Sequence, residues 1–289
     1  MSRTLQGIAW MAASSVLWTL IEALGRQVPR GYSPYQTVWV RYATHLVVML
    51  AILGPWRGAE LVRTRRPGLQ ILRSLLMLGM PVCFIVAVGR LSAAETWSIF
   101  WVSPVLVALL SRWWLGERSG LRHWAAAAAA LLGASLILGT GLGALRGAAV
   151  LPLGMAACFS VYVVMTRAMR EETTTATLFY TALFVLVPLS VGLPAFWHAL
   201  RWKAALPMAA IGVAGLFGLL ALDRALHLAP ASVVAPFAAL QAVWTLLLDH
   251  LLFGHRVGAA QFCGALALVG GGLYVCVREW AAGTALRRA

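Results

Sequence analysis

The chain has 289 residues, of which 61% are hydrophobic and only 11% are charged, and its mean hydropathy is +0.83. Soluble globular domains carry about 45–50% apolar and about 25% charged residues, so this composition excludes a soluble enzyme and predicts a membrane protein. The formal charge of +14 comes from basic residues scattered between apolar runs. That scatter lacks the single stripe that follows a phosphate backbone, so we expect no nucleic-acid partner.

Apolar runs between arginine, proline and glycine predict ten membrane-spanning helices, because each span of a lipid bilayer needs about 20 apolar residues. The first run is too long for the core of a cleaved signal peptide and lacks a small-residue cleavage site, so we expect it to remain as the first span. The predicted spans are 6–24, 34–54, 68–88, 93–113, 122–140, 147–167, 175–197, 204–223, 231–252 and 258–279.

The basic residues of the short loops are unevenly divided between the two sides of the membrane. About two thirds of them fall on the side that holds the amino terminus, and such loops stay in the cytoplasm. We therefore expect a multi-pass protein of the bacterial inner membrane with both termini in the cytoplasm.

An internal repeat appears when the sequence is shifted by 138 positions, which lays residues 91–120 over 229–258 and LGER (115–118) over FGHR (253–256). The first two spans of each half match less well, at a shift of 144. Because five spans is an odd number, the second copy enters the membrane from the opposite side. Residues 1–145 and 146–289 are thus predicted to form two inverted five-helix repeats of an all-α membrane protein. Such repeats are typical of secondary transporters, which bind substrate between the halves near the middle of the membrane.

Motifs for catalysis or cofactor binding are missing from the sequence. Lys203 is the only lysine, which excludes a Walker A motif, and neither HExxH nor GxSxG occurs. The four cysteines lie in hydrophobic runs without CxxC spacing, so we expect no metal site and no cofactor. The rivals from another class, a membrane enzyme or a non-transporting assembly subunit, are disfavoured by these absences and by the inverted repeat.

AASSVLW (12–18), the VRY motif that ends at Tyr42, and the LGER and FGHR motifs occur in an order that resembles bacterial EamA-type members of the drug/metabolite transporter superfamily. Within that superfamily the chain is most similar to the YddG-type amino-acid exporters, and the resemblance covers essentially the whole chain. It implies ten helices around a central cavity and the export of small metabolites. Two departures stand out: His255 replaces the usual acid of the LGE motif, and Ala242 replaces a proline often found after Gln241.

The third and fourth predicted helices carry aromatic and sulfur side chains at depth. Trp97 and Trp101 share a helix face at i,i+4 near mid-membrane, and Pro104 is expected to bend their helix. Met77, Pro81 and Phe84 form one stripe of the third helix, with Met80 beside it and a further bend expected at Pro81. This lining suits an apolar or aromatic substrate group, although the same residues could simply pack or face lipid.

The second repeat and the first helix add further candidates for the cavity. Gln241 can both donate and accept hydrogen bonds, so it could hold an ammonium or carboxylate group, or could instead bond to a neighbouring helix. Pro236 is the candidate for a kink in the ninth helix. The deep aromatic or polar residues of these helices are Trp18, Tyr162, Phe217, Phe237, Gln241 and Trp244.

Charged residues inside spans are candidates for a gate, because their burial in lipid is costly. Arg41 lies about 10 Å deep in its span at 1.5 Å per residue, and Glu22 and Glu95 lie near the same outer face. We expect these three to lock the outer gate, with snorkelling of Arg41 to the interface as the alternative. Asp223 and Asp249 lie within about a turn of their span ends and are expected to be solvated.

Because no Asp or Glu lies near the midplane, the sequence predicts transport without proton coupling. The sequence as a whole predicts a monomeric or homodimeric inner-membrane carrier that exports amino acids with aromatic or apolar side chains by alternating access. The alternative is a proton-coupled exporter of drugs or other small metabolites from the same superfamily.

Overall fold

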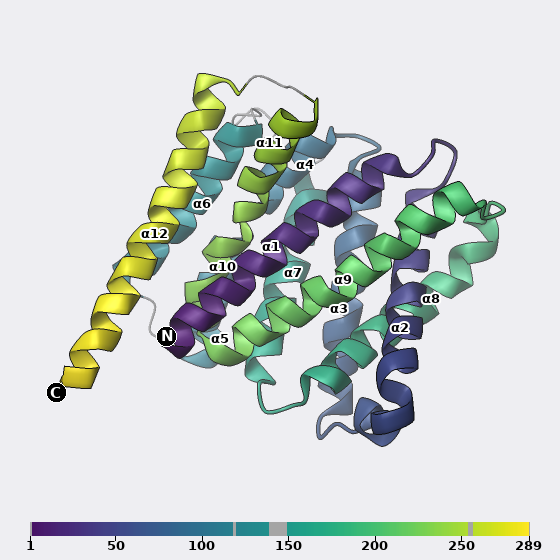
Figure 1. Ribbon diagram of the computed structural model, residues 1–289, viewed down its shortest axis with the longest axis horizontal. Coiled ribbons are helices and arrows are strands. Elements are labelled where there is room, and N and C mark those ends of the chain that lie inside the picture. The colour runs from purple at the N-terminus through teal and green to yellow at the C-terminus, as the bar shows by residue number, and fades with distance from the viewer. Residues whose placement is uncertain (1, 118–119, 139–148, 254–256, 289) are drawn as a thin grey trace.

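A computed structural model describes residues 2–117, 120–138, 149–253 and 257–288, and the regular structure within these ranges is helical (Figure 1). The helices are α1 (Arg3–Gln27), α2 (Pro34–Val62), α3 (Pro67–Ala87), α4 (Ala93–Phe100), α5 (Ser103–Leu115), α6 (Leu121–Leu138), α7 (Val150–Ala168), α8 (Thr174–Phe196), α9 (Trp202–Leu228), α10 (Ala231–Ala238), α11 (Leu240–Phe253) and α12 (Ala259–Arg288).

These helices make ten passes, as the sequence predicts. Within the described ranges, nine helical stretches are long and apolar enough to cross a membrane, and His123–Leu138 of α6 is a shorter apolar helix. The α4–α5 pair counts as one interrupted span, Ala93–Leu115, and the α10–α11 pair as another, Ala231–Leu251. The predicted boundary between the repeats, at residues 145 and 146, lies outside the described residues.

The two interrupted spans break at corresponding places. A shift of 138 positions carries Phe100, the last residue of α4, onto Ala238, the last residue of α10. Pro104 stands in the first turn of α5, where its missing N–H costs no helical hydrogen bond. In the second copy Pro236 lies two residues before α10 ends. Pro81, by contrast, lies inside α3, which continues to Ala87.

Helix packing has the pattern of two inverted repeats. α1 packs on α9 and α7 on α3, while α2 packs on α9 and α8 on α3. Exchanging α1 with α7, α2 with α8 and α3 with α9 converts the α1–α9 contact into the α7–α3 contact. The same exchange converts the α2–α9 contact into the α8–α3 contact. The same exchange leaves the α2–α8 and α6–α12 contacts unchanged, as expected for helix pairs that are related by a twofold axis.

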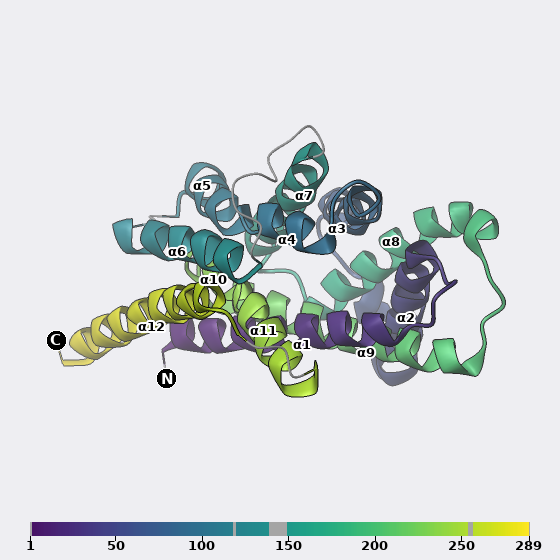
Figure 2. The same cartoon turned by 90° about the horizontal axis from the view of Figure 1, so that it is seen from above.

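The helices form two layers (Figure 2). One layer contains α1, α9 and α12, and the other contains α3, α4, α5 and α7, while α2 and α8 close one side. We call the end of the molecule where α1 begins the amino-terminal end. α5, α7 and α9 finish at that end and α10 begins there, whereas α1 and α11 finish at the opposite end.

Glycines permit the closest approaches between helices. A Cβ atom built on Gly264 of α12 would lie 2.5 Å from the carbonyl oxygen of Gly133 in α6. A Cβ built on Gly212 of α9 would lie 2.7 Å from the carbonyl oxygen of Arg41 in α2. Because real Cβ atoms do not approach so closely, larger residues here would force these helices apart.

Candidate functional site

A narrow cavity lies between the two layers and receives side chains from both repeats. The volume within which the centre of a water molecule can move is only about 20 Å³, so the surrounding helices leave little free space. Among the described residues that line this cavity, none carries an ionised side chain. They are Met11, Ser14, Ser15, Trp18, Met80, Trp97, Phe100, Trp101, Phe159, Leu222, Ala238 and Gln241.

Aromatic rings form one continuous wall of the cavity. The rings of Trp97 and Trp101 are stacked, with centroids 6.4 Å apart and planes 28° apart. Phe100 lies edge-on to Trp101 at 5.1 Å and 5.4 Å from Phe159 of α7, which carries the wall into the second repeat. Such contacts hold the rings in place.

Neutral polar groups face the aromatic wall. Ser14 donates a hydrogen bond to the carbonyl oxygen of Gly218 at 2.9 Å, and Ser15 accepts one from the indole N–H of Trp244 at 3.0 Å. The side-chain amide of Gln241 has no hydrogen-bond partner within the described residues, so its donors and acceptor are available to a solute. The cavity therefore combines stacking surfaces with uncharged hydrogen-bonding groups.

Five of the eleven residues that the sequence predicts for the cavity lie on its wall in the structure. They come from α1, α3, α4, the α4–α5 break and α11, and they are Trp18, Met80, Trp97, Trp101 and Gln241.

The structure does not bring the other six predicted residues to the wall, and they are Met77, Phe84, Tyr162, Phe217, Phe237 and Trp244. Phe84 supports it from behind, with its ring 5.5 Å from that of Trp97. Met77 and Phe237 are buried in the core, and Tyr162 bonds to Arg73. Phe217 is 46% exposed on the outer surface.

An ion pair closes the amino-terminal end of the molecule. The Arg167 guanidinium of α7 contacts the Glu117 carboxylate at 3.1 Å, and both side chains are nearly buried. Arg167 also donates to the carbonyl oxygen of Leu226 at 2.6 Å. Glu117 accepts hydrogen bonds from the backbone N–H groups of Ala231 at 3.3 Å and Ser232 at 3.4 Å. This pair, the amino-terminal gate, thus ties together α5, α7, α9 and α10.

The start of α10 depends on Glu117 because its own sequence lacks a cap. α4 begins with a capping box in which Ser92 and Glu95 satisfy each other's backbone N–H groups. The corresponding residues of α10 are Pro230 and Val233, which cannot accept these bonds. Glu117 supplies the missing acceptor from another helix and places its charge at the positive end of α10.

A second ion pair closes the opposite end. Arg26 of α1 contacts Asp249 of α11 at 2.5 Å and Glu22 at 3.2 Å, and Thr245 donates to Glu22 at 3.1 Å. We call this set the opposite gate. It joins α1 to α11, which are the exchange partners of α7 and α5, so the two gates link equivalent helices. Ion pairs thus join helices at both ends of the molecule, and the narrow cavity lies between them.

The three residues predicted as the outer gate do not meet in the structure. Only Glu22 belongs to the opposite gate. The Arg41 guanidinium lies 4.7 Å from the centre of the Trp18 ring in a cation–π contact, beside Gly215 of α9. Glu95 is held by Ser92 in the capping box of α4.

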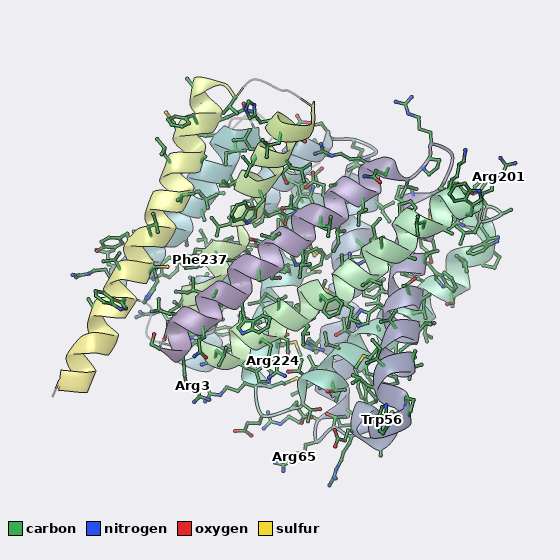
Figure 3. All side chains as sticks on the ribbon, in the orientation of Figure 1. Arg3, Trp56, Arg65, Arg201, Arg224 and Phe237 are labelled. Atoms are coloured by element: carbon green, nitrogen blue, oxygen red, sulfur yellow. The ribbon has the colours of Figure 1, made fainter. Side chains whose placement is uncertain are left out.

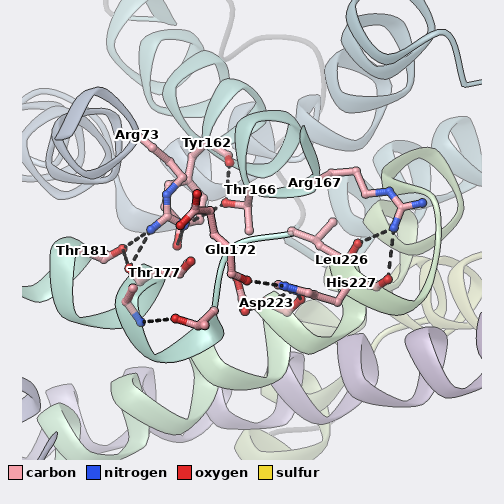
Figure 4. Close-up of polar contacts among 12 residues, drawn as sticks. Arg73, Tyr162, Thr166, Arg167, Glu172, Thr177, Thr181, Asp223, Leu226 and His227 are labelled. Atoms are coloured by element: carbon pink, nitrogen blue, oxygen red, sulfur yellow. Dashed lines mark hydrogen bonds and ion pairs between the residues drawn. The ribbon is translucent and has the colours of Figure 1, made fainter. Parts of the chain in front are cut away.

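A buried arginine links the repeats near the amino-terminal end. The side chain of Arg73 is completely buried and donates to Tyr162 and Thr166 of α7 at 3.3 and 3.0 Å. It also donates to the carbonyl oxygen of Thr177 at 2.7 Å and to Thr181 at 2.8 Å, both in α8 (Figure 4). Its position inside the predicted span 68–88 was the available signal.

Asp223 corrects another expectation. It is 2% exposed rather than solvated, because α9 continues to Leu228 and Asp223 thus lies inside the helix rather than at its end. Its carboxylate lies 3.3 Å from the imidazole of His227, one turn further along α9 (Figure 4).

Known proteins resemble this chain in sequence and architecture. The model of the EamA-like transporter family matches residues 5–139 and 146–277, one match for each repeat. A protein named riboflavin transporter from Vibrio cholerae is 24% identical over 270 residues, which cover 92% of this chain and 91% of that protein. Another of that name, from Rhizobium johnstonii, is 27% identical over 295 residues, covering 96% of this chain and 93% of that protein.

A crystal structure that is 17% identical in sequence supports the fold, with a TM-score of 0.81 and coverage of 92% of this chain and 94% of that chain. Neither of the two named relatives is called an amino-acid exporter, so the YddG-type part of the resemblance gains no support from them. Matched in both repeats, the chain belongs to the EamA-like transporter family and is a multi-pass membrane transporter of small metabolites, not an enzyme.

Proposed function

We propose that the protein carries a neutral, planar aromatic metabolite of the riboflavin type across the membrane by alternating access. The uncharged, aromatic lining of the central cavity is the observation that carries this proposal. A flat heteroaromatic ring can stack on Trp97 and Trp101, and the N–H and carbonyl groups of its edge can bond to Gln241. The names of the two relatives support the same class of solute.

An amino acid with an aromatic or apolar side chain is the second candidate, because the Trp97–Trp101 stack suits such a side chain as well. Its ammonium and carboxylate groups, however, need charged or strongly polar partners, since an unpaired charge in an apolar site is costly. The described lining offers serine hydroxyls, indole N–H groups and one amide, all of them uncharged. This chemistry ranks a neutral solute above a zwitterion.

The two gates provide the elements of an alternating-access cycle. Opening the amino-terminal gate would join the cavity to the open hollow, about 470 Å³ in volume, that Glu117 and Arg167 also line. Opening the opposite gate would expose the cavity on the other side. One chain contains the cavity and both gates, so a single subunit, alone or in a homodimer, suffices for the cycle.

Loop charges give the proposed orientation and location. The positive-inside pattern puts the amino-terminal end in the cytoplasm of a bacterial inner membrane. The amino-terminal gate then faces the cytoplasm. Export down the solute gradient is the direction that the resemblance to EamA-type exporters implies.

Counterflow in proteoliposomes tests the substrate. Vesicles preloaded with riboflavin should accumulate labelled riboflavin transiently, and external riboflavin should compete far better than L-tryptophan or a hydrophobic cation. Counterflow of labelled tryptophan with none of riboflavin would establish the amino-acid alternative.

The absence of a charged group from the described lining predicts transport that is independent of the proton gradient. The rival is proton coupling, which the buried Asp223–His227 pair favours because buried ionisable groups in membranes often relay protons. At a fixed riboflavin gradient, uptake should not change with an imposed pH gradient, in the wild type or in Asp223→Asn. Proton coupling requires the opposite result: dependence on the pH gradient that Asp223→Asn abolishes and Glu171→Gln, at an exposed site, retains.

A further inference from the structure

A second hollow lies on the outer surface at the amino-terminal end, between α1, α7 and α9. It holds about 830 Å³ and is lined by four arginines and one glutamate, among them Arg3, Arg170 and Arg224, together with Trp10, Leu220 and Leu228. Figure 3 shows Arg3 and Arg224 close to each other at this end, far from Arg201. A positive hollow at the end of a helix bundle is placed at the boundary between lipid and water.

Three of these arginines have no ion-pair contact within the described residues. Arg167 is neutralised by Glu117 in the amino-terminal gate. Arg3, Arg170 and Arg224 are exposed, and their guanidinium groups have no ion pair or hydrogen bond within the described part of the chain. Planar guanidinium groups bind phosphate oxygens in pairs and are the preferred phosphate ligands of proteins. The hollow therefore has the charge and donors for a phosphate ester.

Deeper in the membrane, the same faces of α1 and α9 carry apolar side chains. Trp10 follows Arg3 by seven residues on α1, and Phe217 precedes Arg224 by seven on α9, so each pair shares a helix face about 10 Å apart. Both rings are exposed, Trp10 by 41% and Phe217 by 46%. Because α1 and α9 pack together, they form a slot with arginines at its mouth and aromatic rings along its depth.

We propose that this slot binds an anionic glycerophospholipid. Its phosphate lies among Arg3, Arg170 and Arg224, and one acyl chain follows Trp10, Leu220 and Phe217. A free phosphate in water gains nothing from the apolar depth, whereas a lipid uses both parts. Basic pockets between membrane helices bind acidic headgroups by the same combination.

Quenching of Trp10 by brominated lipid tests the site in the full-length protein. In phosphatidylcholine nanodiscs, a minor fraction of brominated phosphatidylglycerol should quench the Trp10 signal more than the same fraction of brominated phosphatidylcholine. The Trp10 signal is obtained by subtracting the tryptophan fluorescence of Trp10→Phe from that of the wild type. Each exposed arginine near an anionic lipid contributes about a fivefold enrichment, so Arg224→Gln should reduce the preference by about that factor. Arg201→Gln, at the opposite end of α9, should leave the preference unchanged.

Equal quenching by the two lipids would overturn the proposal, as would equal effects of Arg224→Gln and Arg201→Gln. A third arm separates lipid from free anion. If inorganic phosphate removes the preference while chloride at the same ionic strength does not, the hollow binds a soluble anion and the lipid assignment is wrong.

Discussion

Glu117 shows how one residue can serve both a gate and a helix end. Its carboxylate pairs with Arg167 and caps α10, whose own first residues cannot do so. Glutamine keeps an acceptor for the backbone N–H groups but removes the charge that neutralises a nearly buried guanidinium. Glu117→Gln should therefore lower stability by about 1–3 kcal/mol, measured as a fall in the thermal midpoint in detergent. Glu171→Gln, at an exposed carboxylate, is the control, and equal midpoints for the two variants would contradict this role.

Single residues were the least predictable part of the sequence. Trp97 and Trp101 could be assigned a common face because their spacing is local, and they stack in the structure. Arg73 could not be assigned a role, since its partners Thr177 and Thr181 stand more than 100 positions away. Phe217 has the depth expected of a cavity residue, yet α9 turns it outward, and depth alone does not reveal a helix's inner face.

The positions of the helices were largely predictable, because the internal repeat gives each span of one half a corresponding span in the other half. The shift of 138 positions found in the sequence maps the first residue of α4 onto that of α10 and the first residue of α6 onto that of α12. The break between α10 and α11 was harder to predict because Ala242 stands where a proline was expected. Pro236, upstream of the break, has no counterpart in α4, so the two copies interrupt the same span with different residues.

The α6–α12 pair makes a prediction about helix packing. Gly264→Ala places a methyl group against the Gly133 carbonyl oxygen, at a distance of 2.5 Å before any adjustment. Relief of that overlap costs about 1–3 kcal/mol and should lower the thermal midpoint. Gly270→Ala adds the same methyl group to the same helix where nothing lies within 4 Å, so its midpoint should stay level or rise. An undiminished midpoint in Gly264→Ala would show that the helices do not cross there.

At the scale of the whole molecule, the two repeats place equivalent ion pairs at the two ends. Each gate joins the end of one interrupted span to the first helix of the other repeat, through Glu117 and Arg167 at one end and Asp249 and Arg26 at the other. The cavity lies between the gates and takes residues from both repeats. Two equivalent closures around one site are what a carrier needs to open to one side at a time.

We propose that the solute crosses this aromatic cavity, and the concentration dependence of riboflavin counterflow in proteoliposomes tests that path most directly. Trp97→Leu removes a stacking surface from the cavity wall but keeps an apolar side chain, so the half-saturating riboflavin concentration should rise about tenfold. Trp113→Leu is the matched control, because Trp113 is 84% exposed on the outer surface, and its half-saturation should match the wild type. Unchanged half-saturation in Trp97→Leu, or an equal rise in Trp113→Leu, would contradict a path through the cavity.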